Sequence, residues 1–131
     1  MAIERFEDVA AWQGARALVR AVCGIVERGA FARNYGLRDQ IRRATVSIMS
    51  NIAEGFERGS DSDFRRFLFM AKGSAGEVRS LLCVALDLDY IDRTTHQELT
   101  EQATRISRQL AGFIKYLDSN IVRAKWKGRP E

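Results

Sequence analysis

The sequence predicts an all-α fold, a single domain built as an antiparallel up-down-up-down four-helix bundle. Apolar residues recur at the spacing of one helix face in four long segments, and no segment alternates with period two over the length of a strand. The only proline is Pro130, one residue from the end, so no proline interrupts a long helix. With 131 residues, 46% of them hydrophobic and 29% charged, the chain fits one globular domain with a sizeable core.

The first two helices are expected over about residues 9–28 and 37–56. Glu7 and Asp8 place negative charge at the start of the first helix, where the helix dipole favours it. Residues 29–36 are expected to form a loop, and Gly55 and Gly59 are expected to mark the end of the second helix. The inward stripe of the second helix is predicted to be Leu37, Ile41, Ala44, Ile48 and Ile52.

The third and fourth helices are expected over about residues 61–89 and 95–124. Each is preceded by the pattern of a capping box, Ser60 with Asp63 for the third helix and Thr95 with Glu98 for the fourth. Short loops between four amphipathic helices favour antiparallel neighbours. Ile48, Ala71, Leu82 and Leu110 are expected to be core residues.

Positive charge is concentrated at the C-terminus, where residues 125–131 are expected to form a basic tail. The net charge of the chain is +4, and the last eleven residues contribute +3 of it. Four cations and one aromatic ring lie close together, a composition that can neutralise phosphates and stack on a base. A solvated terminus, with the tryptophan packed against the bundle end, explains the same residues. The residues are Arg123, Lys125, Trp126, Lys127 and Arg129.

A second basic group begins the second helix, where Arg38, Arg42 and Arg43 lie close together. These side chains could bind an anion such as a nucleic-acid phosphate. Acidic residues are interleaved with them, so a charged face in contact with solvent is the alternative.

A polar ladder runs along the second helix beside its apolar stripe. Ser47, Asn51, Glu54 and Arg58 follow one another at helical spacing. The ladder could bind a ligand, but a structural seam between helices is favoured. A small serine allows close helix approach, and Glu54 can pair with Arg58 at i,i+4.

The second and third helices carry more apolar residues than one face needs, which favours a subunit interface. The alternative is a wide bundle core. The second apolar arc of the second helix includes Thr45 and Phe56, and the third helix adds Met70, Cys83 and Val84. The residues we expect in the oligomer interface are Val46, Met49, Ala53 and Phe69.

The sequence offers no recognisable catalytic, metal or cofactor site. His96 is the single histidine, and no nearby Cys or His residues complete a metal set, so no metal and no cofactor are expected. Cys23 and Cys83 lie in helical patterns and are expected to be buried, reduced thiols. The N-terminus lacks the apolar stretch of a secretory signal, and no run is long enough to span a membrane, so we expect a cytoplasmic protein without membrane contact.

Several motifs together resemble those of the bacterial four-helix bundle proteins encoded in ribosomal RNA intervening sequences. Met49 is a departure, because relatives commonly carry proline there. More distantly, the chain is similar to the accessory proteins of diversity-generating retroelements. The motifs are Phe6–Val9 with Trp12, Tyr35–Ala44, Ser47–Gly55, Phe64–Leu68 and Ala71–Glu77.

The resemblance implies an up-down bundle and homo-oligomers, with ring-like pentamers expected. For the distant group it implies binding to nucleic acid and to a reverse transcriptase, and it supplies no catalytic residues. The sequence therefore favours a non-enzymatic homo-oligomeric scaffold that binds RNA or DNA through basic residues. The alternative is a protein-interaction module, with an unidentified protein partner and no nucleic-acid binding.

Overall fold

The computed structural model describes the backbone of residues 3–126 and the side chains of residues 3–121, and all of its regular structure is helical. A short 3₁₀ helix, η1 (Phe6–Asp8), precedes α1 (Ala10–Val26). The remaining helices are α2 (Gly29–Arg33), α3 (Tyr35–Glu57), α4 (Asp61–Asp87) and α5 (Arg93–Trp126). The described residues contain no strand, in agreement with the predicted all-α class.

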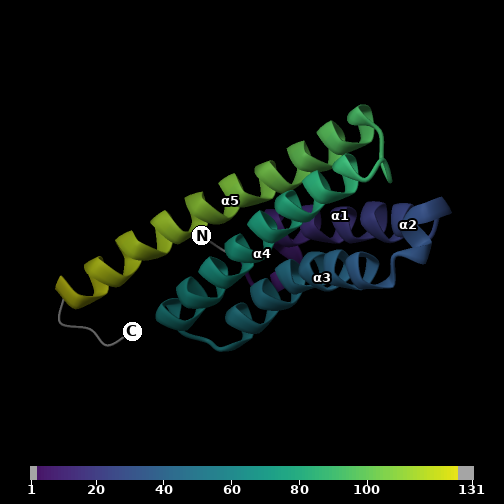
Figure 1. Cartoon of the computed structure of the whole chain (residues 1–131). Coiled ribbons are helices and arrows are strands. Elements are labelled where there is room, and N and C mark those ends of the chain that lie inside the picture. The colour runs from purple at the N-terminus through teal and green to yellow at the C-terminus, as the bar shows by residue number, and fades with distance from the viewer. Residues whose placement is uncertain (1–2, 127–131) are drawn as a thin grey trace.

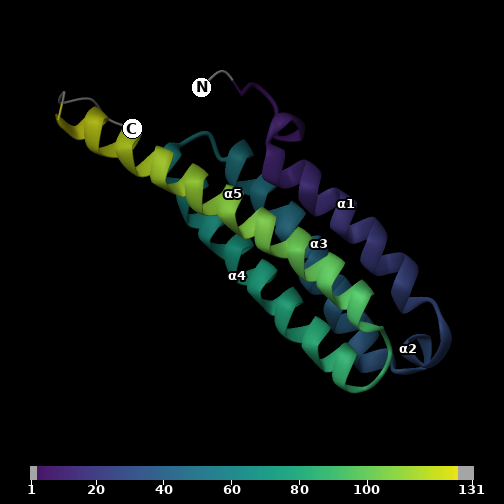
Figure 2. The ribbon, with the colours of Figure 1, turned by 90° about the horizontal axis from the view of Figure 1, so that it is seen from above.

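The four long helices form one bundle in which each runs antiparallel to the long helix before it (Figure 1). The helix α3 packs against α1 and α4, and α5 packs against α4 and α1, which closes the bundle. Seen from above, α5 runs along the bundle beside α4, and its C-terminal end reaches beyond the start of α4 (Figure 2). The C-terminal end of α5 therefore projects from the bundle.

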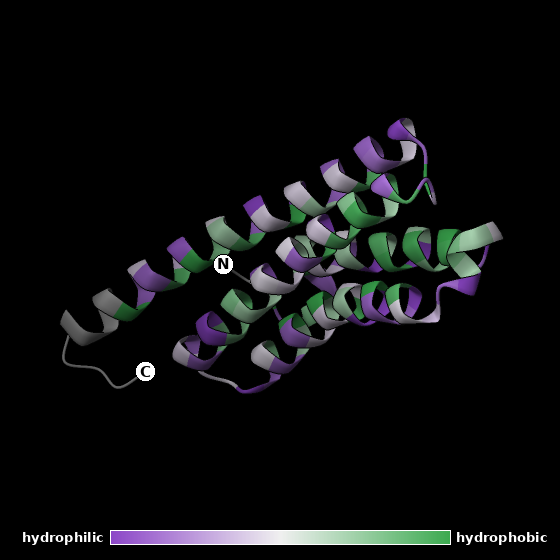
Figure 3. Cartoon of the chain, viewed as in Figure 1, coloured by the Kyte–Doolittle hydropathy of each residue, from purple (hydrophilic) through white to green (hydrophobic). Residues whose placement is uncertain are grey.

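The core lies along the axis of the bundle, where the apolar stripes of the four helices meet (Figure 3). The four predicted core residues, Ile48, Ala71, Leu82 and Leu110, are all fully buried. Helical periodicity identified the inward stripes because a bundle buries one stripe of each helix.

The segment expected to be a loop at residues 29–36 contains the short helix α2, so that expectation was wrong. Gly29, with a φ of +56°, reverses the chain after α1. Phe31 of α2 is buried and its ring lies 5.2 Å from the Tyr90 ring. The side-chain Oδ1 of Asn34 accepts the Leu37 backbone N–H at 3.2 Å, while its side-chain amide donates to the Tyr90 hydroxyl at 3.1 Å. One turn of helix is stabilised here by an aromatic contact from the opposite loop, which local sequence does not reveal.

Gly55 lies inside α3 and does not end it, which corrects a second expectation. The helix ends after Glu57, and Gly59, with a φ of +84°, provides the left-handed residue that reverses the chain. Gly55 is buried where α3 and α4 approach closely, because a Cβ at this position would lie only 2.5 Å from the Phe67 Cβ.

Replacing Gly55 with alanine should therefore destabilise the fold by about 1–3 kcal/mol, the usual cost of overpacking. The matched control is Gly24→Ala in α1, where a Cβ meets no atom within 4 Å. There, alanine should stabilise the helix by up to about 1 kcal/mol. Urea unfolding followed by circular dichroism measures both. Equal stabilities for the two variants would contradict the close approach at Gly55.

Helix α5 begins earlier than expected, and Asp92 takes the capping role that had been assigned to Thr95. The Asp92 Oδ1 accepts the backbone N–H of Thr95 at 2.8 Å. This backbone hydrogen bond, followed by one from the Thr95 side chain, lowers the pKa of Asp92 below its usual value. The cap predicted for α4 is confirmed, since Ser60 Oγ accepts the Asp63 N–H at 3.1 Å.

The Asp92 cap should stabilise the fold only while the carboxylate is charged. Because its pKa is lower in the folded chain than in the unfolded chain, its contribution is present above the unfolded pKa and is lost as the pH falls through the folded pKa. The difference in Tm between wild type and Asp92→Ala should thus be constant near neutral pH and shrink below about pH 4. Thermal melts over this range measure it, and a difference that persists unchanged in acid would contradict the cap.

Candidate functional site

The basic start of α3 separates into side chains with different roles. Arg38 is committed locally, because its guanidinium donates to the Ala32 carbonyl at 3.1 Å, lies 3.4 Å from Asp39 and stacks 4.9 Å from the Tyr35 ring. These contacts fix the turn between α2 and α3. Arg38 is therefore less available to an external anion than the sequence indicated.

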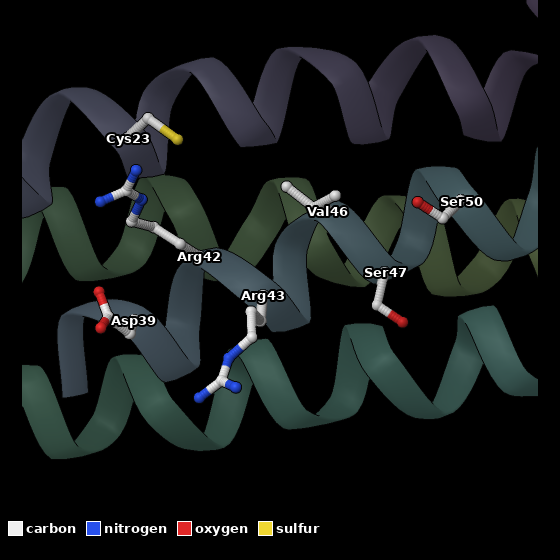
Figure 4. Close-up of a pocket in the computed structure, with 7 residues that line it drawn as sticks. All are labelled: Cys23, Asp39, Arg42, Arg43, Val46, Ser47 and Ser50. Carbon is white, nitrogen blue, oxygen red and sulfur yellow. The ribbon is translucent and has the colours of Figure 1, made fainter. Parts of the chain in front are cut away.

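Arg42 and Arg43 line an open hollow of about 840 Å³ over α3. Arg42 points toward α1 and lies 3.7 Å from Glu27, whereas Arg43 points toward α4 (Figure 4). Arg43 makes no ion pair with any residue that the structure describes. The two guanidinium groups diverge, so they do not form one preformed anion site. The other residues of the hollow are Cys23, Asp39, Val46, Ser47 and Ser50.

The polar ladder is a set of contacts along α3, one of which reaches α4. The Asn51 amide donates to the carbonyl oxygen of Ser47 at 2.9 Å and to its hydroxyl at 3.0 Å. Ser74 of α4 donates to the same Ser47 hydroxyl at 3.0 Å. Glu54 pairs with Arg58 at 3.2 Å on the exposed surface. Internal partners thus occupy the ladder, which supports its interpretation as a structural seam, and Ser74 is a member that the sequence analysis missed.

Much of the second apolar arc of α3 is internal. Thr45 is buried, and its hydroxyl donates to the Ile41 carbonyl at 2.6 Å. Met49 and Phe56 are half-buried and pack against the core. Ala53 is also half-buried, which leaves Val46, with 44% of its surface exposed, as the accessible large residue of this arc.

Helix α4 and the residue that caps its C-terminal end present the larger exposed apolar surface. Met70 and Val84 of α4 and the C-cap Leu88 are 47%, 41% and 48% exposed. Met70 and Leu88 are 18 residues apart, about five helical turns, and Val84 falls one turn before Leu88, so the three lie along one line of the helix. We call these three residues the α4 line. Phe69 is also exposed, but the Arg65 guanidinium lies 4.8 Å from its ring and partly covers it.

Three further cations share one side of α5 and were not singled out from the sequence. Arg105, Arg108 and Lys115 are exposed, and no described residue forms an ion pair with them. Their spacing of three and seven residues places them on one helix face. A helical wheel of the fourth predicted helix would have shown this face from the sequence. We call these residues the α5 basic side. It leads along α5 toward the C-terminal tail.

The side chains of the predicted tail site, Arg123, Lys125, Trp126, Lys127 and Arg129, lie outside the described residues. Within the part of the chain that the structure does describe, no cluster of three His, Cys, Asp or Glu side chains could hold a metal ion. No helix among the described residues is both long enough and apolar enough to cross a membrane.

The two cysteines are not buried as expected. Cys83 is exposed and Cys23 is half-buried. His96, which appeared isolated in the sequence, contacts Cys83 because the α4–α5 connection folds the two helices side by side. The apolar pattern of α4 predicted which of its residues face the core. It did not predict how much of the remaining helix surface the neighbouring helices cover.

Comparison with known proteins decides the family. The family model described as 23S rRNA-intervening sequence protein matches residues 7–112. The chain belongs to this family. The fold is shared with a crystallised protein of unknown function from the S23 ribosomal protein family of Bacteroides thetaiotaomicron VPI-5482. The TM-score is 0.74 at 22% identity, over 81% of this chain and 99% of the relative. No curated protein matches the chain.

Membership in the intervening-sequence family confirms the resemblance drawn from the motifs. The family match spans η1, α1, α2, α3 and α4 and much of α5, so it includes the polar seam and the α4 line. Neither the description of the intervening-sequence family nor that of the crystallised relative indicates an enzymatic activity.

Proposed function

We propose that this intervening-sequence family member is a non-enzymatic scaffold that assembles with copies of itself and binds nucleic acid. The α4 line carries the assembly part of the proposal. Three large apolar side chains aligned along one helix are unusual on the surface of a monomer and are typical of a surface covered by a partner.

A second copy of the chain is the partner that best fits the α4 line. The line also passes Glu77, which lies two turns after Met70. The Glu77 carboxylate is exposed and has no ion-pair partner among the described residues. A ring forms when the α4 line of one copy packs against a different surface of the next and the rotation closes. The family resemblance supports five copies, and the exposed side chains of Val46 and Phe69 are expected to take part in the contact.

Nucleic-acid binding is supported by the position and availability of positive charge. The α5 basic side supplies three unpaired cations, and the C-terminal residues Arg123, Lys125, Lys127 and Arg129 supply four more. Contacts of this kind neutralise phosphates without reading sequence. Several copies in one ring present several such surfaces, so a long polyanion that reaches more than one of them gains affinity through avidity.

Fluorescence anisotropy with labelled RNA and DNA of several sequences tests the function. The full-length protein should bind all of them at low salt, with an affinity that falls steeply as salt rises and depends little on sequence. Absence of binding at low salt would contradict the proposal. It would favour the alternative of a protein-interaction module, in which the same assembly holds a protein partner.

A further inference from the structure

A cysteine and a histidine from different helices are in contact near the α4–α5 connection. The Sγ of Cys83 lies 3.7 Å from the Nε2 of His96, which is the only histidine of the chain. Cys83 is exposed and His96 is half-buried, so an external reagent can reach the sulfur while the ring stays packed. A thiol beside an imidazole is the arrangement that activates sulfur nucleophiles, because the imidazole can remove the thiol proton.

The backbone on either side of the contact is held by local hydrogen bonds. Hydrogen bonds fix the α4–α5 connection, since the Tyr90 N–H donates to the Ala85 carbonyl at 2.9 Å and the Asp92 cap fixes the start of α5. The Thr100 Oγ1, one turn after His96, lies 3.5 Å from the same Nε2. In one tautomer of the neutral ring, Nε2 carries a lone pair and accepts hydrogen bonds. The Cys83 thiol and the Thr100 hydroxyl then compete for that single lone pair.

A hollow of about 750 Å³ adjoins His96 and carries excess negative charge. Its charged lining consists of Asp87, Asp89 and Asp92 against the single cation Arg93. A surface with three carboxylates and one guanidinium attracts small cations and repels small anions.

We propose that Cys83 is a reactive thiol that undergoes exchange with small, positively charged disulfides, with His96 as its base. The thiol proton passes to His96 Nε2, and the Cys83 sulfur attacks one sulfur of the disulfide. A new S–S bond to Cys83 forms, the original S–S bond breaks, and the departing thiolate takes the proton back from the imidazolium. Cys83 is oxidised to a mixed disulfide while half of the reagent is reduced to a free thiol, so no further oxidant is needed.

The site is independent of the proposed assembly. The Cys83 side chain turns toward α5, where it meets His96, while the α4 line contains the neighbouring Val84 and follows a different side of the helix. The reaction is therefore expected whether or not the protein forms a ring, and its failure leaves the proposed function untouched.

The test uses the full chain with Cys23 replaced by serine, so that Cys83 is the only thiol. Cystamine, a cationic disulfide, should give one mixed disulfide at Cys83 by mass spectrometry. His96→Gln should slow the exchange about tenfold near neutral pH, since an ordinary thiol is only a few per cent thiolate there. Thr100→Val, which removes the competing hydroxyl, should leave the rate unchanged or raise it. Circular dichroism checks that each variant is folded.

The charge preference is measured with oxidised glutathione, an anionic disulfide, as the second reagent. The ratio of the cystamine rate to the glutathione rate should be several-fold higher for the folded protein than for the same chain unfolded in urea. An unchanged ratio would contradict the role of the acidic hollow. Rates for His96→Gln within about twofold of the parent, or a Thr100→Val rate well below it, would show that Cys83 is an ordinary surface thiol and overturn the proposal.

Discussion

Replacing Val84 with glutamate is expected to convert the assembled protein into monomers. Val84 belongs to the α4 line, and a carboxylate buried there by a second copy would lose its water without gaining a partner. A loss of only about 2.8 kcal/mol at each contact corresponds to a hundredfold weaker association. Sedimentation velocity at micromolar protein should therefore show one chain per particle for the variant.

The position of Val84 keeps this test separate from folding. Its side chain is 41% exposed in the single chain, so glutamate there should leave the thermal midpoint of the monomer nearly unchanged. Met49, expected in the interface from sequence, is less suitable because it packs against the core, where a charge would disturb the bundle itself. The matched control is Ala111→Glu on the exposed part of α5, which should leave the assembly intact. Dissociation by both variants would show a non-specific charge effect.

Ending the chain after Ile121 should weaken nucleic-acid binding at least about tenfold at low salt. The truncation removes the four tail cations, Arg123, Lys125, Lys127 and Arg129. Each phosphate contact on duplex DNA contributes a slope of about −0.9 to the dependence of log affinity on log salt. Loss of the tail should therefore make the slope shallower by about 0.9 for each phosphate contact that is lost, up to four contacts. Anisotropy titrations at several salt concentrations measure this slope.

Two charge variants test whether the α5 basic side contributes to the nucleic-acid binding that remains without the tail. Replacing Arg105 and Arg108 with glutamine removes two unpaired cations of the α5 basic side and should weaken binding further. Replacing Arg66, which pairs with Asp63 at 3.3 Å, removes a cation with an internal partner and should have little effect. Equal affinity of the full-length and truncated chains would exclude the tail and direct attention to Arg42 and Arg43.

Most of the fold could be predicted from the sequence, because a bundle buries one stripe of each long helix. The stripes at residues such as Ile48 and Leu110 identified the core correctly. The errors occurred where a contact from a distant segment decides the local structure. Tyr90 supports α2, and Phe67 packs so closely on Gly55 that glycine is needed inside the helix. A helical pattern contains neither partner.

The candidate surfaces were predictable only in outline, because exposure depends on how neighbouring helices are rotated. Thr45 looked like part of an outer arc but is buried, and its hydroxyl is satisfied within α3 by the Ile41 carbonyl. Arg38 looked available but is held by the α2–α3 turn. The contact of Cys83 with His96 required the α4–α5 connection to fold before it could be recognised.

The molecular mass of the unmodified full-length protein in solution tests the central claim most directly. Sedimentation velocity at micromolar concentration and moderate salt should show a single species of about five times the 14.8 kDa chain mass. A dimer would contradict the number of copies, which depends on the family resemblance. A monomer throughout the micromolar range would contradict the scaffold itself, because the α4 line would then remain open to solvent.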